Sequence, residues 1–325
     1  MDLTICVPCF NDAKNVDKLL SSIHSSDTES LIYEILVCDG KSDDGIEEIV
    51  LSWESKIPVR LISTSPRASA SENINAGVAC AKGAIFCRID SHCLVTRNFI
   101  KSGLNEFSLR RNEFSALGPS VDVIGSKDTF MSNTVSTLYM SPFLLGPSKF
   151  KRSIFYKNYS GEISNIYLGF FLTEDVKELR FAENIQRKQD IEFLSRLREK
   201  RRVGFYNSSA VEIKYVLKQD SIVTLMGRCF NQGQLLFQSV GASRLVHFLP
   251  LLCALLFMGN VIMNSSLAPY MLGTYLICSF SFGLLECRSI LGSLLAVFLF
   301  PCVHLSYVVG NGIGLFNTLY IRFNS

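Results

Sequence analysis

Short apolar runs alternate with amphipathic stretches over the first ninety residues. Apolar, strand-forming residues fill 3–7, 32–38, 59–63 and 84–89. Between these runs, 46–53 and 71–81 have helical spacing, and a helix after the first run places Val16, Leu19, Leu20 and Ile23 on one face. Asn11 or Asp12 can cap that helix. Strands that alternate with helices predict a parallel sheet with right-handed crossovers.

From residue 114 to 211 the pattern is less regular. It contains short predicted strands at 116–119 and 165–171 and a predicted helix at 190–200. We interpret this part as the second half of the same domain, which then covers 1–222. The next stretch, 223–244, is amphipathic, and we expect it to lie at a membrane surface.

The final part of the chain, 245–325, is strongly apolar. We expect about three membrane helices, at 245–263, 267–285 and 290–316, because about 20 apolar residues cross a bilayer. Basic residues precede the first of them, namely Lys200, Arg201, Arg202, Arg228 and Arg244. This distribution predicts a multi-pass protein of the inner membrane with its catalytic domain in the cytoplasm. No segment near Met1 has the pattern of a signal peptide, which agrees with that orientation.

Charge and cysteine usage narrow the function classes. The formal net charge of +3 is too small to indicate binding of nucleic acid. The 11 cysteines are an odd number and are scattered along the chain, which is typical of a reducing compartment.

Polar residues follow several of the predicted strands, at the sheet edge where ligands of parallel sheets bind. Asp39 opens a turn rich in Gly, Ser and Asp. Such a turn can be an ordinary loop, or its carboxylate can accept hydrogen bonds from a base or a ribose. Asp90 and His92 end another strand, and strand alternation would place them on the same side. A carboxylate with an imidazole suits Mn²⁺ well and Mg²⁺ less well, as a Lewis acid for a departing diphosphate.

Asp190 opens the predicted helix at 190–200. It can simply be a first-turn carboxylate favoured by the helix dipole. It can also be a general base for an acceptor hydroxyl. The basic run at 196–202 indicates a solvated helix face or a membrane-surface contact rather than a phosphate site. The Gly310, Gly312 and Gly314 repeat lies in the apolar tail with no preceding strand, and we interpret it as helix packing or a re-entrant turn.

Taken in order, these residues resemble the family 2 glycosyltransferases, which have the GT-A fold, a Rossmann-like mixed α/β sheet. The segment 5–12, ICVPCFND, resembles the opening V-x-I-P-x-[YF]-N-E, and 39–45, DGKSDDG, resembles D-G-x-S-x-D-G. Asn75-Ala76-Gly77 with Ala81-Lys82-Gly83 is similar to N-x-G…A-x-G. The segment 88–92, RIDSH, resembles the R-x-D-A-H of succinoglycan-type glucosyltransferases, as do 165–169, 189–192 and 196–198.

The resemblance implies inverting transfer of a sugar from a nucleotide donor, with UDP as the expected nucleotide. It implies that Asp39 and Asp12 hold the nucleoside, that Asp90 and His92 face the diphosphate and a divalent cation (Mn²⁺ or Mg²⁺), and that Asp190 is the base. The full set of expected substrate-binding residues is Pro8, Asn11, Asp12, Asp39, Ser42, Asp44, Asn75, Arg88, Asp90, Gln189 and Arg228.

The sequence departs from the processive members of the family at one motif. Arg228-Cys229-Phe230-Asn231-Gln232-Gly233-Gln234 stands where they have Q-x-x-R-W. We therefore expect addition of a single sugar to a lipid-linked saccharide in surface polysaccharide biosynthesis. Two other functions remain open: a polyprenyl-phosphate sugar transferase, and a catalytically inactive membrane scaffold.

Overall fold

The computed structural model describes the chain outside residues 30, 147–148, 150, 152, 154–155, 167, 186–188, 218–220, 235–247 and 325, and outside the side chains of 145 and 319–324. The chain divides into two compact units. The first comprises Met1–Asp122, Lys149–Arg152 and Tyr156–Val216, and the second comprises Val123–Ser148, Ser153–Phe155 and Leu217–Ser325. Residues 123–148, which the sequence analysis assigned to the catalytic domain, thus cluster with the C-terminal helices. The expected domain boundaries at 222 and 244 stay a prediction.

Within the described residues of the first unit, nine strands form one mixed sheet. They are β1 (Leu3–Cys9), β2 (Tyr33–Asp39), β3 (Val59–Ser63), β4 (Ile85–Arg88), β5 (Cys93–Val95), β6 (Ala116–Gly125), β7 (Gly161–Ile163), β8 (Gly169–Leu172) and β9 (Phe205–Leu217). Their order is β3-β2-β1-β4-β8-β6-β9-β5, and β7 pairs with β9. The pairs β2–β3, β1–β2 and β1–β4 are parallel, whereas β8 is antiparallel to β4 and β6. The predicted mixed α/β sheet is confirmed.

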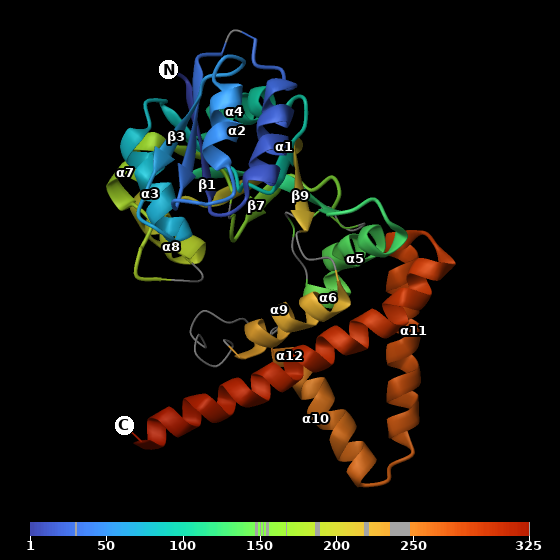
Figure 1. Ribbon diagram of the computed structural model, residues 1–325. Coiled ribbons are helices and arrows are strands. Elements are labelled where there is room, and N and C mark those ends of the chain that lie inside the picture. Colours follow the sequence, from blue (N-terminus) through green and yellow to red (C-terminus); the bar gives the residue numbers. More distant parts are fainter. Residues whose placement is uncertain are drawn as a thin grey trace. The chain divides into compact units, whose positions relative to one another are not determined.

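Helices cover both faces of this sheet. They are α1 (Ala13–His24), α2 (Ile46–Trp53), α3 (Ala70–Cys80), α4 (Phe99–Arg110), α7 (Thr173–Leu179) and α8 (Gln189–Arg201). Figure 1 shows α3, α7 and α8 on one face and α1 and α2 on the other. Every residue of β1 is buried, because a central parallel strand is covered on both sides. Cys6 and Cys38 pack in the core beneath α3 and α8, and alternation turns their neighbours to the opposite face.

Helix α1 shows where local reasoning missed a long-range contact. Asp12 occupies the N-cap position, as predicted, but its side chain makes no capping hydrogen bond. The backbone N–H of Ala13 instead donates to Asp44 Oδ2 at 2.7 Å. The cap therefore comes from the loop after β2, and the carboxylate of Asp12 is available for other contacts.

Two strands of the irregular region differ from their predicted extents. The strand expected at 116–119 continues to Gly125 as β6. The strand expected at 165–171 begins only at Gly169 as β8, and residue 167 lies outside the described part. Gly169 has a φ of +144°, and a side chain there would collide with the Leu117 carbonyl oxygen. The close approach of β8 to β6 thus requires a glycine at this position.

Apart from the last residues of β6 and β9, the regular elements in the described part of the second unit are helices. They are α5 (Phe130–Met140), α6 (Pro142–Leu145), α9 (Ile222–Gln234), α10 (Leu249–Ile262), α11 (Leu267–Cys287) and α12 (Ile290–Asn324). Two helical stretches, Leu267–Cys287 and Ile290–Thr318, are long and apolar enough to cross a membrane. Helix α10 is apolar but has 14 residues, about 21 Å at 1.5 Å per residue and short of about 30 Å of hydrocarbon. Residues 245–247, the expected start of the first span, lie outside the described part.

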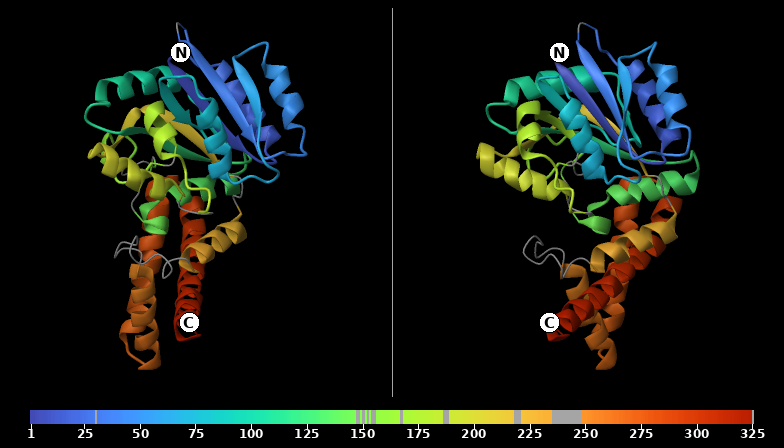
Figure 2. Two further views of the ribbon diagram at one scale, coloured as in Figure 1. Left: turned by 90° about the vertical axis from the view of Figure 1, so that its left-hand side faces the viewer. Right: turned by 60° about the vertical axis from the view of Figure 1, so that its left-hand side comes forward.

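Helix α9 runs alongside α12, as Figures 1 and 2 show. A Cβ at Gly310 would collide with the Phe230 carbonyl oxygen, and one at Gly314 with that of Gln234. At Gly312 the space is open. Gly310 and Gly314 therefore form a small-xxx-small stripe that brings two helix backbones together. The helix-packing interpretation of this repeat is confirmed, and the amphipathic stretch that begins near 223 packs against a helix of its own unit.

His304 joins three segments of the second unit. Its Nδ1 lies 2.7 Å from the Tyr275 hydroxyl of α11, and its Nε2 lies 2.9 Å from the Phe143 carbonyl oxygen of α6. The Phe143 ring stacks on Phe282 with a centroid distance of 4.8 Å. Because Nε2 contacts a carbonyl, it must donate the proton, and Nδ1 then accepts from Tyr275. This polar residue of an apolar helix thus has both ring nitrogens satisfied.

Candidate active site

Several of the predicted site residues follow strands at one edge of the sheet in the first unit. The register pairs Cys9 of β1 with Asp39 of β2, and Cys6 of β1 with Arg88 of β4. The carboxyl ends of β2, β1 and β4 are therefore adjacent. Because β1 separates the other two strands, the axes of β2 and β4 lie about 10 Å apart at ~4.8 Å per strand spacing, and β4 ends three residues of β1 earlier than β2. This edge is where parallel sheets bind their ligands.

Asp39 organises the loop that follows β2. Its Oδ2 accepts a hydrogen bond from the Ser42 backbone N–H at 2.8 Å, and its Oδ1 accepts from the Ser42 hydroxyl. The same hydroxyl accepts from the Asn11 backbone N–H at 2.7 Å. The loop reverses at Gly45, where φ is +84°, a conformation that glycine adopts without strain. Asp39, Ser42 and Asn11 are thus brought together, whereas Pro8 is buried within β1 opposite Cys38.

The buried Asp12 links the start of α1 to the segment after β4. Its Oδ2 accepts a hydrogen bond from the Ser91 hydroxyl, and its Oδ1 accepts from the Asn15 amide at 2.7 Å. Asp12 and Ser91 are far apart in the sequence. Their contact ties the start of α1 to the segment that carries Asp90.

Arg88 connects the two carboxylates that were expected to do chemistry. Its Nε and Nη2 lie 3.2 and 3.1 Å from Asp90 Oδ1, and its Nη1 donates to Asp190 Oδ1. The side chain of Arg88 is only 6% exposed, whereas that of Asp190 is 24% exposed. The structure thus places Asp90, at the end of β4, and Asp190, at the start of α8, on one guanidinium. Arg88 directs Nε, Nη2 and Nη1 at carboxylates within the protein, and substrate binding by Arg88 stays a prediction.

Burial and ion pairing act in opposite directions on these groups. Burial raises the pKa of Asp190 above the usual aspartate range, the Arg88 charge partly offsets this rise, and Asp90 adds to it. Burial disfavours the charged form of Arg88, but the carboxylates of Asp90 and Asp190 outweigh it and raise the pKa of Arg88. Arg88 therefore remains charged, and Asp190 is a stronger proton acceptor than an exposed aspartate.

The segment Asp90-Ser91-His92 is a turn. Strand β4 ends at Arg88, and the Cys93 backbone N–H donates to the Asp90 carbonyl oxygen at 3.0 Å. Strand alternation therefore does not apply to Asp90 and His92, and that part of the sequence argument is wrong. The His92 ring packs edge-on against Tyr215 at a centroid distance of 4.5 Å. Among the described residues, no group of three or more His, Cys, Asp or Glu side chains is arranged to hold a metal ion.

Helix α8, which carries Asp190, is clamped onto α7 by its basic side chains. The fully buried Asp175 of α7 is paired with Lys200 at 2.8 Å and with Arg201 at 2.7 Å. Arg196 donates to the carbonyl oxygens of Leu179 and Arg180 at the end of α7. These three residues are half-buried or exposed and also make ion pairs or hydrogen bonds with α7, so the expected solvated or membrane-facing surface stays a prediction. Contacts within the protein hold the helix that carries Asp190.

Three other expected site residues have different surroundings. Asn75 is buried and its amide bonds the Phe181 backbone in both directions, at 2.8 Å each, so it holds a loop. Gln189 is half-buried at the first position of α8. Arg228 is in α9 of the second unit, where it hydrogen-bonds Tyr139. Substrate binding by these three residues stays a prediction.

Two aromatic residues at this edge were not among the predicted site residues. The ring of Phe10 is 40% exposed and lies beside Gly40, 3.3 Å from where a Cβ would be. An exposed aromatic next to Asp39 can stack on a nucleobase. Phe181 lies under the Arg88 guanidinium, 5.9 Å from it. The aromatic position of the opening motif could have revealed Phe10, but no local pattern points to Phe181.

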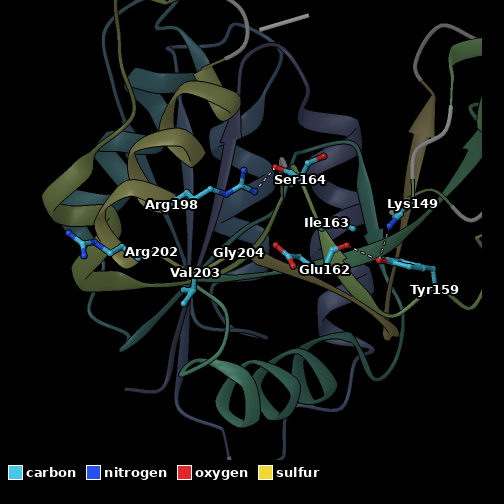
Figure 3. A pocket seen from close by; sticks show the side chains of 9 residues that line it. All are labelled: Lys149, Tyr159, Glu162, Ile163, Ser164, Arg198, Arg202, Val203 and Gly204. Atoms are coloured by element: carbon cyan, nitrogen blue, oxygen red, sulfur yellow. Dashed lines mark hydrogen bonds between the residues drawn. The ribbon is translucent and has the colours of Figure 1, made fainter. Parts of the chain in front are cut away.

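The first unit also has an open hollow of about 710 Å³, shown in Figure 3. It is lined by Lys149, Tyr159, Glu162, Ile163, Ser164, Arg198, Arg202, Val203 and Gly204. Figure 3 shows Arg198 directed toward Ser164, whose carbonyl oxygen it contacts at 3.3 Å. None of the predicted site residues lines this hollow, so it is separate from the Asp39–Asp190 edge.

Comparison with known proteins agrees with the family resemblance found in the sequence. The family model described as Glycosyl transferase family 2 matches residues 4–168, about half of the chain. A dolichyl N-acetyl-α-D-glucosaminyl phosphate 3-β-D-2,3-diacetamido-2,3-dideoxy-β-D-glucuronosyltransferase of Methanococcus voltae is 25% identical over 197 residues. That match covers 59% of this chain and 60% of the relative, so the chain spans less than two thirds of its length.

Solved glycosyltransferase structures share the fold. The mannosyltransferase PcManGT from Pyrobaculum calidifontis, in complex with GDP-Man and Mn²⁺, aligns with a TM-score of 0.57 at 16% identity. The alignment covers 97% of this chain and 87% of that one. S. aureus TarS 1-349, in complex with UDP-GlcNAc, aligns with a TM-score of 0.52 at 13% identity and covers 96% and 91% of the two chains. At these identities the likeness shows the fold alone, which is the predicted one.

Proposed function

Because the chain belongs to glycosyl transferase family 2, we propose that it transfers one sugar from a nucleotide-sugar donor to a lipid-linked saccharide, with inversion at the anomeric carbon. One observation carries this proposal. The carboxylates of Asp39, Asp90 and Asp190 lie along the carboxyl edge of β2, β1 and β4, and Arg88 joins the last two. The edge thus offers a nucleoside end, a diphosphate end and a base in that order.

The nucleoside end is formed by the loops after β1 and β2. Asp39 is already oriented by Ser42 and still has carboxylate lone pairs that can accept from a base or ribose. Phe10 supplies an exposed ring for the base. UDP is the nucleotide that we expect from the sequence resemblance, and TarS binds UDP-GlcNAc in the structure with which this chain aligns.

We assign the diphosphate end to Asp90 and His92, which lie two residues apart in the segment after β4. Arg88 is the only hydrogen-bonding partner of the Asp90 carboxylate among the described residues, and it contacts Oδ1 alone. Carboxylate and imidazole are a donor set that fits Mn²⁺, and fewer than three protein ligands are needed when diphosphate oxygens complete the shell. A cation held there would supply Lewis-acid stabilisation of the departing diphosphate. PcManGT was solved with Mn²⁺.

Asp190 has the place and the basicity for proton removal. It is held by Arg88 through Oδ1, so the lone pairs of Oδ2 remain for the acceptor hydroxyl. As that hydroxyl attacks the anomeric carbon, its proton moves to Asp190. The bond between this carbon and the diphosphate oxygen breaks on the opposite side, which inverts the configuration. No covalent sugar–enzyme intermediate is required.

The second unit and one relative support the proposed acceptor and location. The M. voltae relative acts on a dolichyl-linked sugar phosphate, and this chain has two helices long enough to cross a bilayer. We place the chain at the inner membrane with its first unit in the cytoplasm, in surface polysaccharide biosynthesis. Arg228–Gln234 replaces the processive motif, which favours addition of one sugar, and the R-x-D-x-H form favours the succinoglycan-type subfamily.

Transfer from labelled nucleotide sugars tests the proposal. Membranes containing the full chain are incubated with each donor, Mn²⁺ and lipid-linked saccharides, and the lipid extract is analysed by mass. We expect a product one sugar longer than its acceptor, lost on exhaustive chelation and restored by Mn²⁺. A monosaccharide on polyprenyl monophosphate would show the alternative transferase. Absence of transfer with every donor would favour the inactive scaffold, and full activity after chelation would contradict the metal role of Asp90 and His92.

A further inference from the structure

Arg88 occupies an unusual position between the two halves of the site. It comes from β4, and one of its carboxylate partners, Asp190, comes from α8, 102 residues later. The guanidinium is planar and presents its donors in a fixed fork. With Nε and Nη2 on Asp90 Oδ1 and Nη1 on Asp190 Oδ1, one rigid group sets the placement of these two oxygens relative to each other.

The Arg88 guanidinium lies over the ring of Phe181, which other residues hold in place. Its Cζ lies 5.9 Å from the centroid of the Phe181 ring. Phe181 stacks on Phe193 of α8, with centroids 4.3 Å apart and ring planes at 13°. Asn75 of α3 accepts from the Phe181 backbone N–H and donates to its carbonyl oxygen. Two helices, α3 and α8, thus hold the ring on which Arg88 lies.

The remaining freedom of α8 is small. Its far end is held by Asp175 through Lys200 and Arg201. The helix axis is therefore fixed without Arg88. What Arg88 sets is the position of Asp190 Oδ1 at the near end of the helix, and its placement relative to Asp90.

We propose that Arg88 is a positioning residue that links the diphosphate end of the site to the base, with Phe181 and Asn75 as its support. The inference rests on the proposed function, since it concerns the same reaction. Arg88 is 6% exposed and acts through Asp90 and Asp190 rather than on substrate. A lysine at this position keeps the charge but is a point donor, which cannot hold two carboxylates in a fixed plane.

The Arg88→Lys variant of the full chain tests this role. We expect kcat for transfer to fall about 100-fold, because misplacement of a catalytic group by about 1 Å costs on that order. The Kd of the nucleotide-sugar donor, from calorimetry, should change less than about threefold. Arg60→Lys is the matched control. Arg60 of β3 pairs with buried Glu34 at 3.3 Å and contacts the Cys80 carbonyl oxygen, away from the site, so kcat should stay at the wild-type value.

Phe181→Leu tests whether the ring under Arg88 is needed. It also keeps the proposal testable if the Arg88→Lys variant does not fold. It should lower kcat about tenfold, and the double variant with Arg88→Lys should be no slower than Arg88→Lys alone, because both changes act through one group. Wild-type kcat in Arg88→Lys would overturn the proposal. So would a large rise in donor Kd with unchanged kcat, which would make Arg88 a substrate ligand, or strictly multiplicative losses in the double variant. If wild-type protein transfers no sugar, the proposed function fails, and the base that Arg88 would position fails with it.

Discussion

Replacing Asp190 by asparagine removes a negative charge and a proton acceptor while keeping the shape of the side chain. The Asn Oδ1 can still accept the hydrogen bond from Arg88 Nη1 that Asp190 accepts. Arg88 would also keep Asp90 as a counter-ion at 3.1 Å. The buried guanidinium is therefore not left without a partner, and the change is confined to the chemistry of one carboxylate.

The expected effects on rate and stability differ in size. A positioned general base contributes on the order of 10² to 10⁴ in rate, so kcat should fall about 1,000-fold, equivalent to about 4 kcal/mol in activation free energy. A hydrogen bond to a charged group is stronger than a neutral one by about 1 kcal/mol. With typical stabilities of about 5–15 kcal/mol, the loss of that difference leaves the protein folded.

Single-turnover transfer, donor calorimetry and thermal unfolding separate these effects. Donor Kd should be unchanged, because Asp190 acts on the acceptor. Asp17→Asn is the matched control, since Asp17 of α1 accepts from Trp53 Nε1 at 2.8 Å and loses the same charge away from the site. It should retain wild-type kcat. If Asp190→Asn keeps more than about a tenth of wild-type kcat, Asp190 is not the base.

Three further outcomes follow from the structure. Gly310→Ala should destabilise the protein in micelles by about 1–3 kcal/mol, because the added methyl group overpacks against Phe230. Gly312→Ala, where the space is open, should melt at the wild-type temperature. Equal melting temperatures of the two variants would refute this packing. Phe10→Ala should raise donor KM about tenfold with little change in kcat, as expected for loss of one stacking contact of about 1–3 kcal/mol; an unchanged KM would remove Phe10 from the donor site. Burial raises the pKa of Asp190, so the base takes up a proton at a pH above the usual pKa range of aspartate. As the pH decreases, kcat should therefore begin to fall above that range. A pH–rate profile that stays flat down to that range would argue against this assignment.

Much of the first unit could be predicted from local pattern. The strands β1, β2, β3 and β4 lie within two residues of their predicted ends. Periodicity and turn residues act over a few positions, so they are visible in one sequence. The apolar lengths of α11 and α12 could be predicted for the same reason. So could the loop from Asp39 to Gly45, because its turn residues and carboxylates are consecutive in the sequence.

The contacts that build the candidate site are of another kind, because they join residues far apart in the chain. Asp44 rather than Asp12 caps α1, from 31 residues away, and Asn75 holds Phe181 across 106 residues. The sequence of α8 likewise does not show that the buried carboxylate of Asp175 pairs with two of its basic residues. Residue types and their spacing thus show which chemical groups the chain contains. Which charges meet depends on strand order and helix packing, since a side chain selects its partner by distance in space.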